Sequence, residues 1–237
     1  MEKLQDALTS ILKELKNSYG KSLSKLHITG ELPISVKKLL GQFFNLFDES
    51  CRLFISRHHH PDDKVKCHMG CFWCCYQMPY GISTVEYLYL YNGLFEVSPR
   101  RLFLPSLLDR SEIIDSISKN VQYLSGKSII EELLTAYSRK IAPCPFLDKD
   151  SKLCLVYSFR PLACRMHVSF SSPRFCHPLH KESWRCEAVN IEPSDMVKEA
   201  LKELDETFPF SLSQFLSVGI VQFMVNIMRF QPIKWWS

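Results

Sequence analysis

Apolar residues recur every three or four positions in the first part of the chain, the spacing of one face of an α-helix. The first series predicts a helix ending at Gly20, a residue type common at helix C-termini, and it comprises Leu4, Leu8, Ile11, Leu12, Leu15 and Tyr19. The second predicts a helix whose buried stripe is Val36, Leu40, Phe43, Phe47, Cys51 and Phe54. Because Cys51 belongs to this stripe, we expect it to be a small core residue rather than a metal ligand.

Similar signals predict helices farther along the chain. Ser83 and Glu86 have the spacing of a capping box, in which each side chain satisfies a backbone donor, and an apolar run follows over 87–94. Further helices fit 105–124, 128–139 and 194–206, and a short one fits 160–165 with Pro161 in its first turn. Residues 146–156 predict two short strands around a polar turn. We therefore expect a mainly α protein with an irregular cysteine-rich metal-binding core and a short β-hairpin.

The segment 208–228 carries no charged residue, and Arg229 and two tryptophans follow it as an interfacial anchor would. Its proline, serines and amides make it polar for a membrane span of this length. Gln222, Asn226 and Arg229 fall on one helical face, as an amphipathic helix requires. We expect a helix that is buried or faces a partner, and membrane association is the less favoured alternative.

A chain of 237 residues is long enough to bury a core. We divide it into N-terminal helices (1–60), a cysteine-cluster metal-binding domain (61–190) and C-terminal helices packed on the core (191–237). A net charge of +4, with scattered Lys and Arg, argues against nucleic-acid binding. Acidic residues interrupt the N-terminus and no apolar signal region follows them, so we expect a cytoplasmic protein. Because that compartment is reducing, metal binding is a better explanation of the cysteines than a disulfide framework.

Four of the ten cysteines lie within nine residues, and three more follow at intervals of ten. Thiolates bind zinc in tetrahedral sites or hold iron–sulfur clusters. Side chains of adjacent residues diverge, so Cys75 would serve a neighbouring metal or support the site of Cys74 from outside. Adding Cys186 gives eight thiolates, enough for two four-sulfur sites. The predicted ligands are Cys67, Cys71, Cys74, Cys75, Cys144, Cys154, Cys164 and Cys186.

Other polar residues near the cysteines have weaker signals. Four thiolates around Zn²⁺ leave a net negative charge, so nearby donors stabilise such a site. Arg160 and Arg165 flank Cys164 and would donate to its sulfur or to nearby backbone, or form surface ion pairs instead. The Tyr157 hydroxyl could act in the same way. No role is assigned to Cys176, His177 and His180, and His58–His60 fit a solvated helix end better than a metal site.

Two motifs in order resemble a known family. They are Cys67…Cys71-x2-Cys74-Cys75 and Pro143-Cys144-Pro145-Phe146-Leu147…Cys154-Leu-Val-Tyr157-x2-Arg160-Pro161-x2-Cys164-Arg165. This pattern is similar to the YkgJ-type cysteine-cluster family, also called the CxxCxxCC or zinc- or iron-chelating family. The first gap has three residues instead of the usual two. The resemblance implies a metal-binding domain, and larger relatives that carry it, the flagellin lysine methylases, are linked to an iron–sulfur cluster.

Two functional hypotheses follow. In the first, zinc or an iron–sulfur cluster held by the cysteines makes this a metal-binding protein, and structural zinc would build a module for a protein partner. In the alternative, a cluster such as 4Fe–4S serves an enzyme with chemistry like protein methylation or radical S-adenosylmethionine reactions. Cys67-x3-Cys71-x2-Cys74 resembles the radical enzymes' signature, but the alternating strands and helices of those enzymes are not predicted here. No P-loop, Rossmann or HExxH motif indicates another enzyme class.

Overall fold

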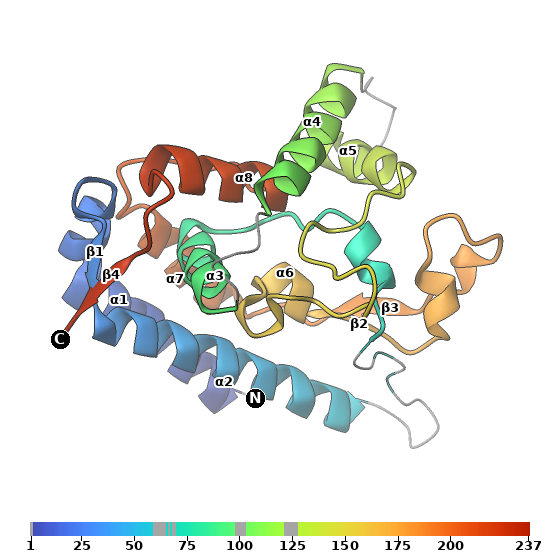
Figure 1. Cartoon of the computed structure of the whole chain (residues 1–237). Helices are drawn as coiled ribbons and strands as arrows, with labels where there is room; N and C mark the ends of the chain where they lie inside the picture. Colours follow the sequence, from blue (N-terminus) through green and yellow to red (C-terminus); the bar gives the residue numbers. More distant parts are fainter. Residues whose placement is uncertain (1, 59–64, 66, 68–69, 98–102, 121–127) are drawn as a thin grey trace.

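The computed structural model describes residues 2–58, 65, 67, 70–97, 103–120 and 128–237. It is mainly α, as predicted. Two long helices, α1 (Glu2–Thr29) and α2 (Ile34–His58), lie side by side along one edge of the molecule (Figure 1). The predicted stripe of α2 is buried except for Phe54, which is partly buried, and Cys51 is only 6% exposed. Burial raises the pKa of the Cys51 thiol to about 11, which agrees with a core role.

The prediction that the first helix ends at Gly20 is wrong. The helix continues to Thr29 because Leu23 and Leu26 extend its apolar face into the core, where both are fully buried. It ends instead at Gly30, whose positive φ of 67° suits a residue without a side chain and whose N–H donates to the Leu26 carbonyl.

Helix α3 (Thr84–Val97) lies in the middle of the fold and is buried along most of its length. Helices α4 (Leu104–Asn120), α5 (Ile129–Ser138) and α7 (Asp195–Asp205) confirm three further predictions, although 121–124 of the predicted fourth helix lie outside the described residues. A full capping box between Ser128 and Glu131 begins α5.

The helix expected over 208–228 is confirmed only in its second part, as α8 (Leu216–Gln222) and the π-helix η5 (Phe223–Ile227) that continues it, whereas 208–215 is not helical. Ile220 and Phe223 are fully buried and Asn226 is exposed, as the amphipathic pattern predicts, but Arg229 lies beyond the helix end with a positive φ of 49°. None of the helices in the described ranges is both long and apolar enough to span a membrane. After η5 the chain returns to the N-terminal helices, where β4 (Lys234–Trp236) pairs in parallel with β1 (Glu31–Pro33).

The predicted hairpin at 146–156 is confirmed in a minimal form. Its two arms pair antiparallel at one isolated bridge, between Leu147 and Cys154, and backbone hydrogen bonds join Phe146 to Leu155 and Asp148 to Leu153. The pairing does not lengthen into a ladder, since the chain enters the 3-10 helix η2 (Tyr157–Phe159) directly after Val156. A longer antiparallel pair is formed by β2 (His167–Ser169) and β3 (Ala188–Asn190). The remaining short elements are η1 (Trp73–Tyr76), α6 (Leu162–Arg165), η3 (Pro173–Cys176) and η4 (Ser183–Arg185). The division into three regions stays a prediction.

Candidate metal centre

Six cysteines from distant parts of the sequence line one pocket of about 530 Å³. Its walls come from η1, the turn around the Leu147–Cys154 bridge, and α6, with apolar side chains of Met78, Phe146 and Leu216 between them. The structure thus brings together six of the eight predicted ligands, Cys71, Cys74, Cys75, Cys144, Cys154 and Cys164.

Backbone hydrogen bonds join the two cysteine motifs. The Cys75 N–H donates to the Phe72 carbonyl within η1 at 2.9 Å, and the Cys75 carbonyl accepts from the N–H of Cys144 at 2.6 Å. The Cys144 carbonyl in turn accepts from the N–H of Leu147, which begins the bridge to Cys154. The adjacent pair and the later cysteines are therefore held in one network of short turns.

The sulfurs of the pocket influence one another's pKa. The pKa of Cys144 is raised to about 12, chiefly by burial and to a lesser extent by the thiolate charges of Cys154 and Cys74. Burial also raises the pKa of Cys164 well above its ordinary value, again with help from neighbouring sulfurs. The pKa of Cys74 is lowered, because its sulfur accepts a hydrogen bond from the thiol of Cys75, whose own pKa rises. A bound cation would relieve this repulsion between thiolates.

The donor chemistry of the pocket suits zinc or iron, which bind thiolates well. As the described side chains stand, however, no three His, Cys, Asp or Glu residues among them are arranged to hold one metal ion. Rotation of a cysteine between staggered rotamers moves its sulfur by about 3 Å. The residue types therefore fit a thiolate-bound metal.

Arg165 holds the Cys164 helix to the rest of the fold. Its side chain is only 2% exposed, and it donates to the carbonyls of Arg160 at 2.7 Å and Ser158 at 2.6 Å. It also pairs with Asp48 on α2. The sequence left open whether Arg165 donates to the Cys164 sulfur, donates to nearby backbone or forms a surface ion pair. The structure shows it donating to nearby backbone.

Arg160 and Tyr157 lie at the rim of the pocket. The Arg160 guanidinium stacks over the Tyr157 ring, 3.7 Å from its centre, and its Nε donates to the Tyr157 carbonyl. The positive charge of Arg160 opposes the burial that raises the pKa of Cys154. Arg160 therefore has the placement expected of a residue that offsets thiolate charge.

The two other predicted ligands do not line this pocket. The Cys67 sulfur accepts the Ser169 N–H at 3.2 Å, and the Cys186 sulfur lies 3.4 Å from that of Cys176. The sequence analysis assigned no role to Cys176. A pairing with Cys186 was indicated in the sequence by their ten-residue separation, which repeats the separations of Cys144, Cys154 and Cys164.

His177 and His180 accept backbone N–H groups through Nδ1, from Leu179 at 3.0 Å and Glu182 at 3.1 Å. They stabilise turns between η3 and η4, so the local role explains them. The side chains of His58–His60 lie outside the described residues.

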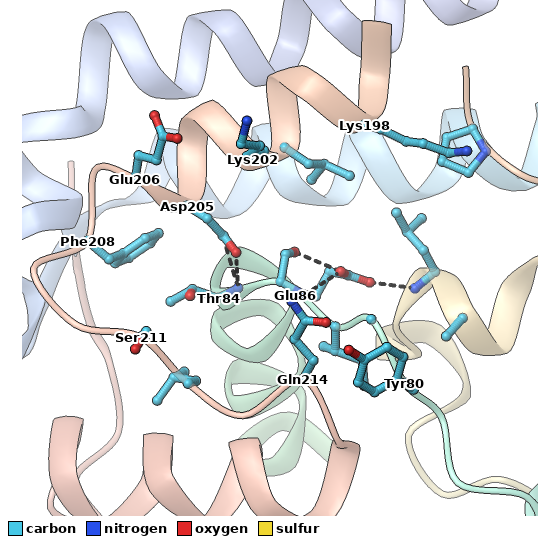
Figure 2. A pocket seen from close by; sticks show the side chains of 18 of the residues that line it. Tyr80, Thr84, Glu86, Lys198, Lys202, Asp205, Glu206, Phe208, Ser211 and Gln214 are labelled. Carbon is cyan, nitrogen blue, oxygen red and sulfur yellow. Dashed lines mark hydrogen bonds between the residues drawn. The ribbon is translucent and has the colours of Figure 1, made fainter. Parts of the chain in front are cut away.

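A second pocket, of about 900 Å³, lies between α3, α6, α7 and the segment 208–214, and it shares Tyr80, Ala163 and Met166 with the cysteine pocket. Figure 2 shows Glu86 reaching from α3 to the first residue of α6, and its carboxylate accepts the N–H of Leu162 at 2.7 Å. This bond positions the helix that carries Cys164.

The capping box predicted for the N-terminus of α3 is only half present. Glu86 does accept the Ser83 N–H, but the Ser83 hydroxyl also donates to Glu86 instead of accepting from the helix. Asp205 of α7 takes the capping role and accepts the N–H of Thr84 at 2.9–3.0 Å (Figure 2). The N-terminus of α3 is therefore capped by a tertiary contact and not by Ser83, since the Asp205 carboxylate comes from a helix about 120 residues away along the chain.

Replacing Asp205 with alanine is expected to lower the free energy of unfolding by about 1–2 kcal/mol, because the cap is lost. Asp205→Asn keeps an acceptor and should cost less.

Burial raises the pKa of Asp205 from 3.8 to about 6. Because the folded state binds this proton more tightly than the unfolded state, protonation of Asp205 stabilises the fold. That stabilisation is complete below pH 3.8 and is lost as pH rises through about 6. Urea unfolding across this range should show the asparagine variant gaining stability relative to the wild type as pH rises. Parallel pH profiles would contradict the assignment.

Comparison with known families identifies one match. The family model CxxCxxCC, a domain to which chelation of zinc or iron is ascribed, matches residues 66–194, more than half of the chain. The match includes all six cysteines of the pocket as well as Cys67, Cys176 and Cys186. Comparisons with curated proteins and with solved structures give no significant match.

Proposed function

Because the chain belongs to the CxxCxxCC family of zinc- or iron-chelating domains, we propose that its pocket holds an iron–sulfur cluster through four cysteine thiolates. Cys144, Cys154 and Cys164 supply three of them. The fourth comes from the adjacent pair Cys74 and Cys75, whose side chains diverge too far to serve equally. When bound, such a cluster supplies one-electron transfer.

The number of thiols around one cavity carries this proposal. Six cysteines line one pocket of about 530 Å³. A single tetrahedral zinc takes four ligands, with sulfurs roughly 3.8 Å apart. A cluster of several irons separates its cysteine ligands more widely and therefore suits donors that line a cavity.

The chain's own residues would set the surroundings of such a cluster. Phe146, Met78 and Leu216 are buried in the pocket wall and exclude water from it. Arg160 places a positive charge beside the thiolates of Cys154 and Cys164. Burial and nearby charge are the features by which proteins tune cluster potentials. We place the protein in the cytoplasm, where thiols stay reduced.

A single structural zinc is the second candidate. The segments around the pocket are short 3-10 turns, one isolated bridge and a four-residue helix, which bury little surface of their own. A metal could tie such segments together, as structural zinc does in small modules. In that case we expect the module to bind a protein partner.

Purification of the untagged protein without oxygen tests the proposal, with a visible spectrum and elemental analysis for iron, zinc and sulfide. We expect iron with equivalent sulfide and a broad band near roughly 400 nm. Zinc in a colourless protein would replace the cluster with the second candidate. Failure to take up either metal, even after anaerobic reconstitution, would contradict metal binding in the pocket.

A further inference from the structure

The pair Cys176 and Cys186 lines a cavity of its own beside the six-cysteine pocket, and Cys67 lies close enough for its charge to raise the pKa of Cys176. Both side chains are thiols here, and the Cys186 thiol donates toward the Cys176 sulfur at 3.4 Å. Cys176 ends η3, and Cys186 directly follows η4, so two short helical turns deliver the two sulfurs to one place. Neither residue lines the six-cysteine pocket.

Successive backbone hydrogen bonds hold this segment in shape. The N–H of His180 donates to the carbonyl of His177, that of Ser183 to His180, and that of Cys186 to Ser183, at 2.9–3.0 Å. The Phe175 ring anchors the loop, because it is buried and lies against the guanidinium groups of Arg174 and Arg185. The close approach of the sulfurs is therefore built into the turns.

A small oxidant can reach the pair from solvent. A cavity of about 380 Å³ is lined by both cysteines, together with His177, Pro178 and Ser183. Cys186 is partly exposed, whereas Cys176 is 9% exposed. Cys186 is thus the more accessible of the two thiols, and the Cys176 sulfur lies 3.4 Å from it.

We propose that Cys176 and Cys186 form a reversible dithiol–disulfide pair that a small-molecule disulfide oxidises. The sulfurs must approach by about 1.4 Å to reach the S–S bond length of about 2.05 Å. Cys186, as the thiolate, attacks one sulfur of glutathione disulfide and releases one glutathione. Cys176 then loses its proton, attacks the Cys186 sulfur and releases the second glutathione. Two protein thiols lose two electrons in total, and one glutathione disulfide becomes two glutathiones.

The pair lies next to the loop that carries Cys74 and Cys75. The His177 ring, one residue after Cys176, contacts the Trp73 ring of η1 with centres 4.7 Å apart. Trp73 directly precedes Cys74 and Cys75 of the pocket. The disulfide would close a loop over a rigid segment and leave the six pocket thiols for the metal.

The test treats the purified full-length protein, in an oxygen-free buffer, with excess glutathione disulfide. Remaining thiols are then alkylated, and peptides are mapped by mass spectrometry. We expect most of the protein to contain a Cys176–Cys186 crosslink that dithiothreitol reverses, with its metal content unchanged. Cys176→Ser should instead keep glutathione on Cys186, because the resolving thiol is gone, while Cys51→Ser should behave like the wild type.

Two results would overturn the proposal. Alkylation of both cysteines after the treatment would show that they do not pair. A crosslink that forms only with loss of bound metal would make them metal ligands. Protein purified with neither iron nor zinc should still form the crosslink, so a failure of the metal proposal is distinguishable from a failure of this one.

Discussion

The variant Cys164→Ser is expected to lose bound metal and the stability that the metal confers. Cys164 lies in the pocket wall on α6, where burial and neighbouring thiolates raise its pKa, and a serine hydroxyl is a poor substitute for this thiolate. If metal is present at a thousand times its dissociation constant, its loss lowers the free energy of unfolding by about 4 kcal/mol. Elemental analysis and urea unfolding of the metal-loaded protein measure both effects.

Cys51→Ser is the matched control for this variant. Cys51 is buried in the stripe of α2, away from the pocket lining, so its replacement should leave metal content unchanged. It places a hydroxyl in the core and should cost about 1–3 kcal/mol of stability. Equal metal content in the two variants would show that Cys164 is not a ligand.

The second large effect is expected from Arg165→Ala. The Arg165 guanidinium is almost fully buried, joins the cysteine loop to Asp48 of α2 and satisfies two carbonyls. Removal of one partner from a buried ion pair costs about 3–5 kcal/mol. Urea unfolding should show this loss, and less metal should be retained, because the preceding residue on α6, Cys164, loses its support.

Arg160→Ala provides the comparison for this prediction. Arg160 is only partly buried and stacks on the exposed ring of Tyr157, so its loss should cost less than about 1 kcal/mol. It should instead affect the metal centre, since its charge lies beside Cys154. If both arginine variants lost the same stability, the anchoring role of Arg165 would be wrong.

Local signals in the sequence predicted the helices well. The stripe on α2 and the start of α5 at Ser128 depend on residues three or four apart, whose side chains necessarily meet on one helix. The first helix shows the limit of such signals. Gly20 can end a helix, but packing of Leu23 and Leu26 in the core outweighs its weak preference.

Features that join distant segments could not be predicted in this way. The cap of α3 by Asp205 and the pairing of β1 with β4 both bring together residues more than a hundred positions apart. A short window of sequence does not indicate which distant residue will cap a helix or which strand will pair with another. The predicted hairpin is limited to a single bridge for the related reason that its second arm continues into η2 and α6 rather than along a ladder.

For the candidate site, the sequence by itself determined the chemistry. Clustered cysteines in the spacing of the CxxCxxCC family indicate a soft-metal centre, because the affinity of thiolates for zinc and iron is a property of the side chain. Only the tertiary structure decided which sulfurs share a pocket, separating the six around it from the pair Cys176 and Cys186. The physical reason is that ligand type is local, whereas the meeting of sulfurs depends on how α3, α6 and α7 hold distant loops against one another.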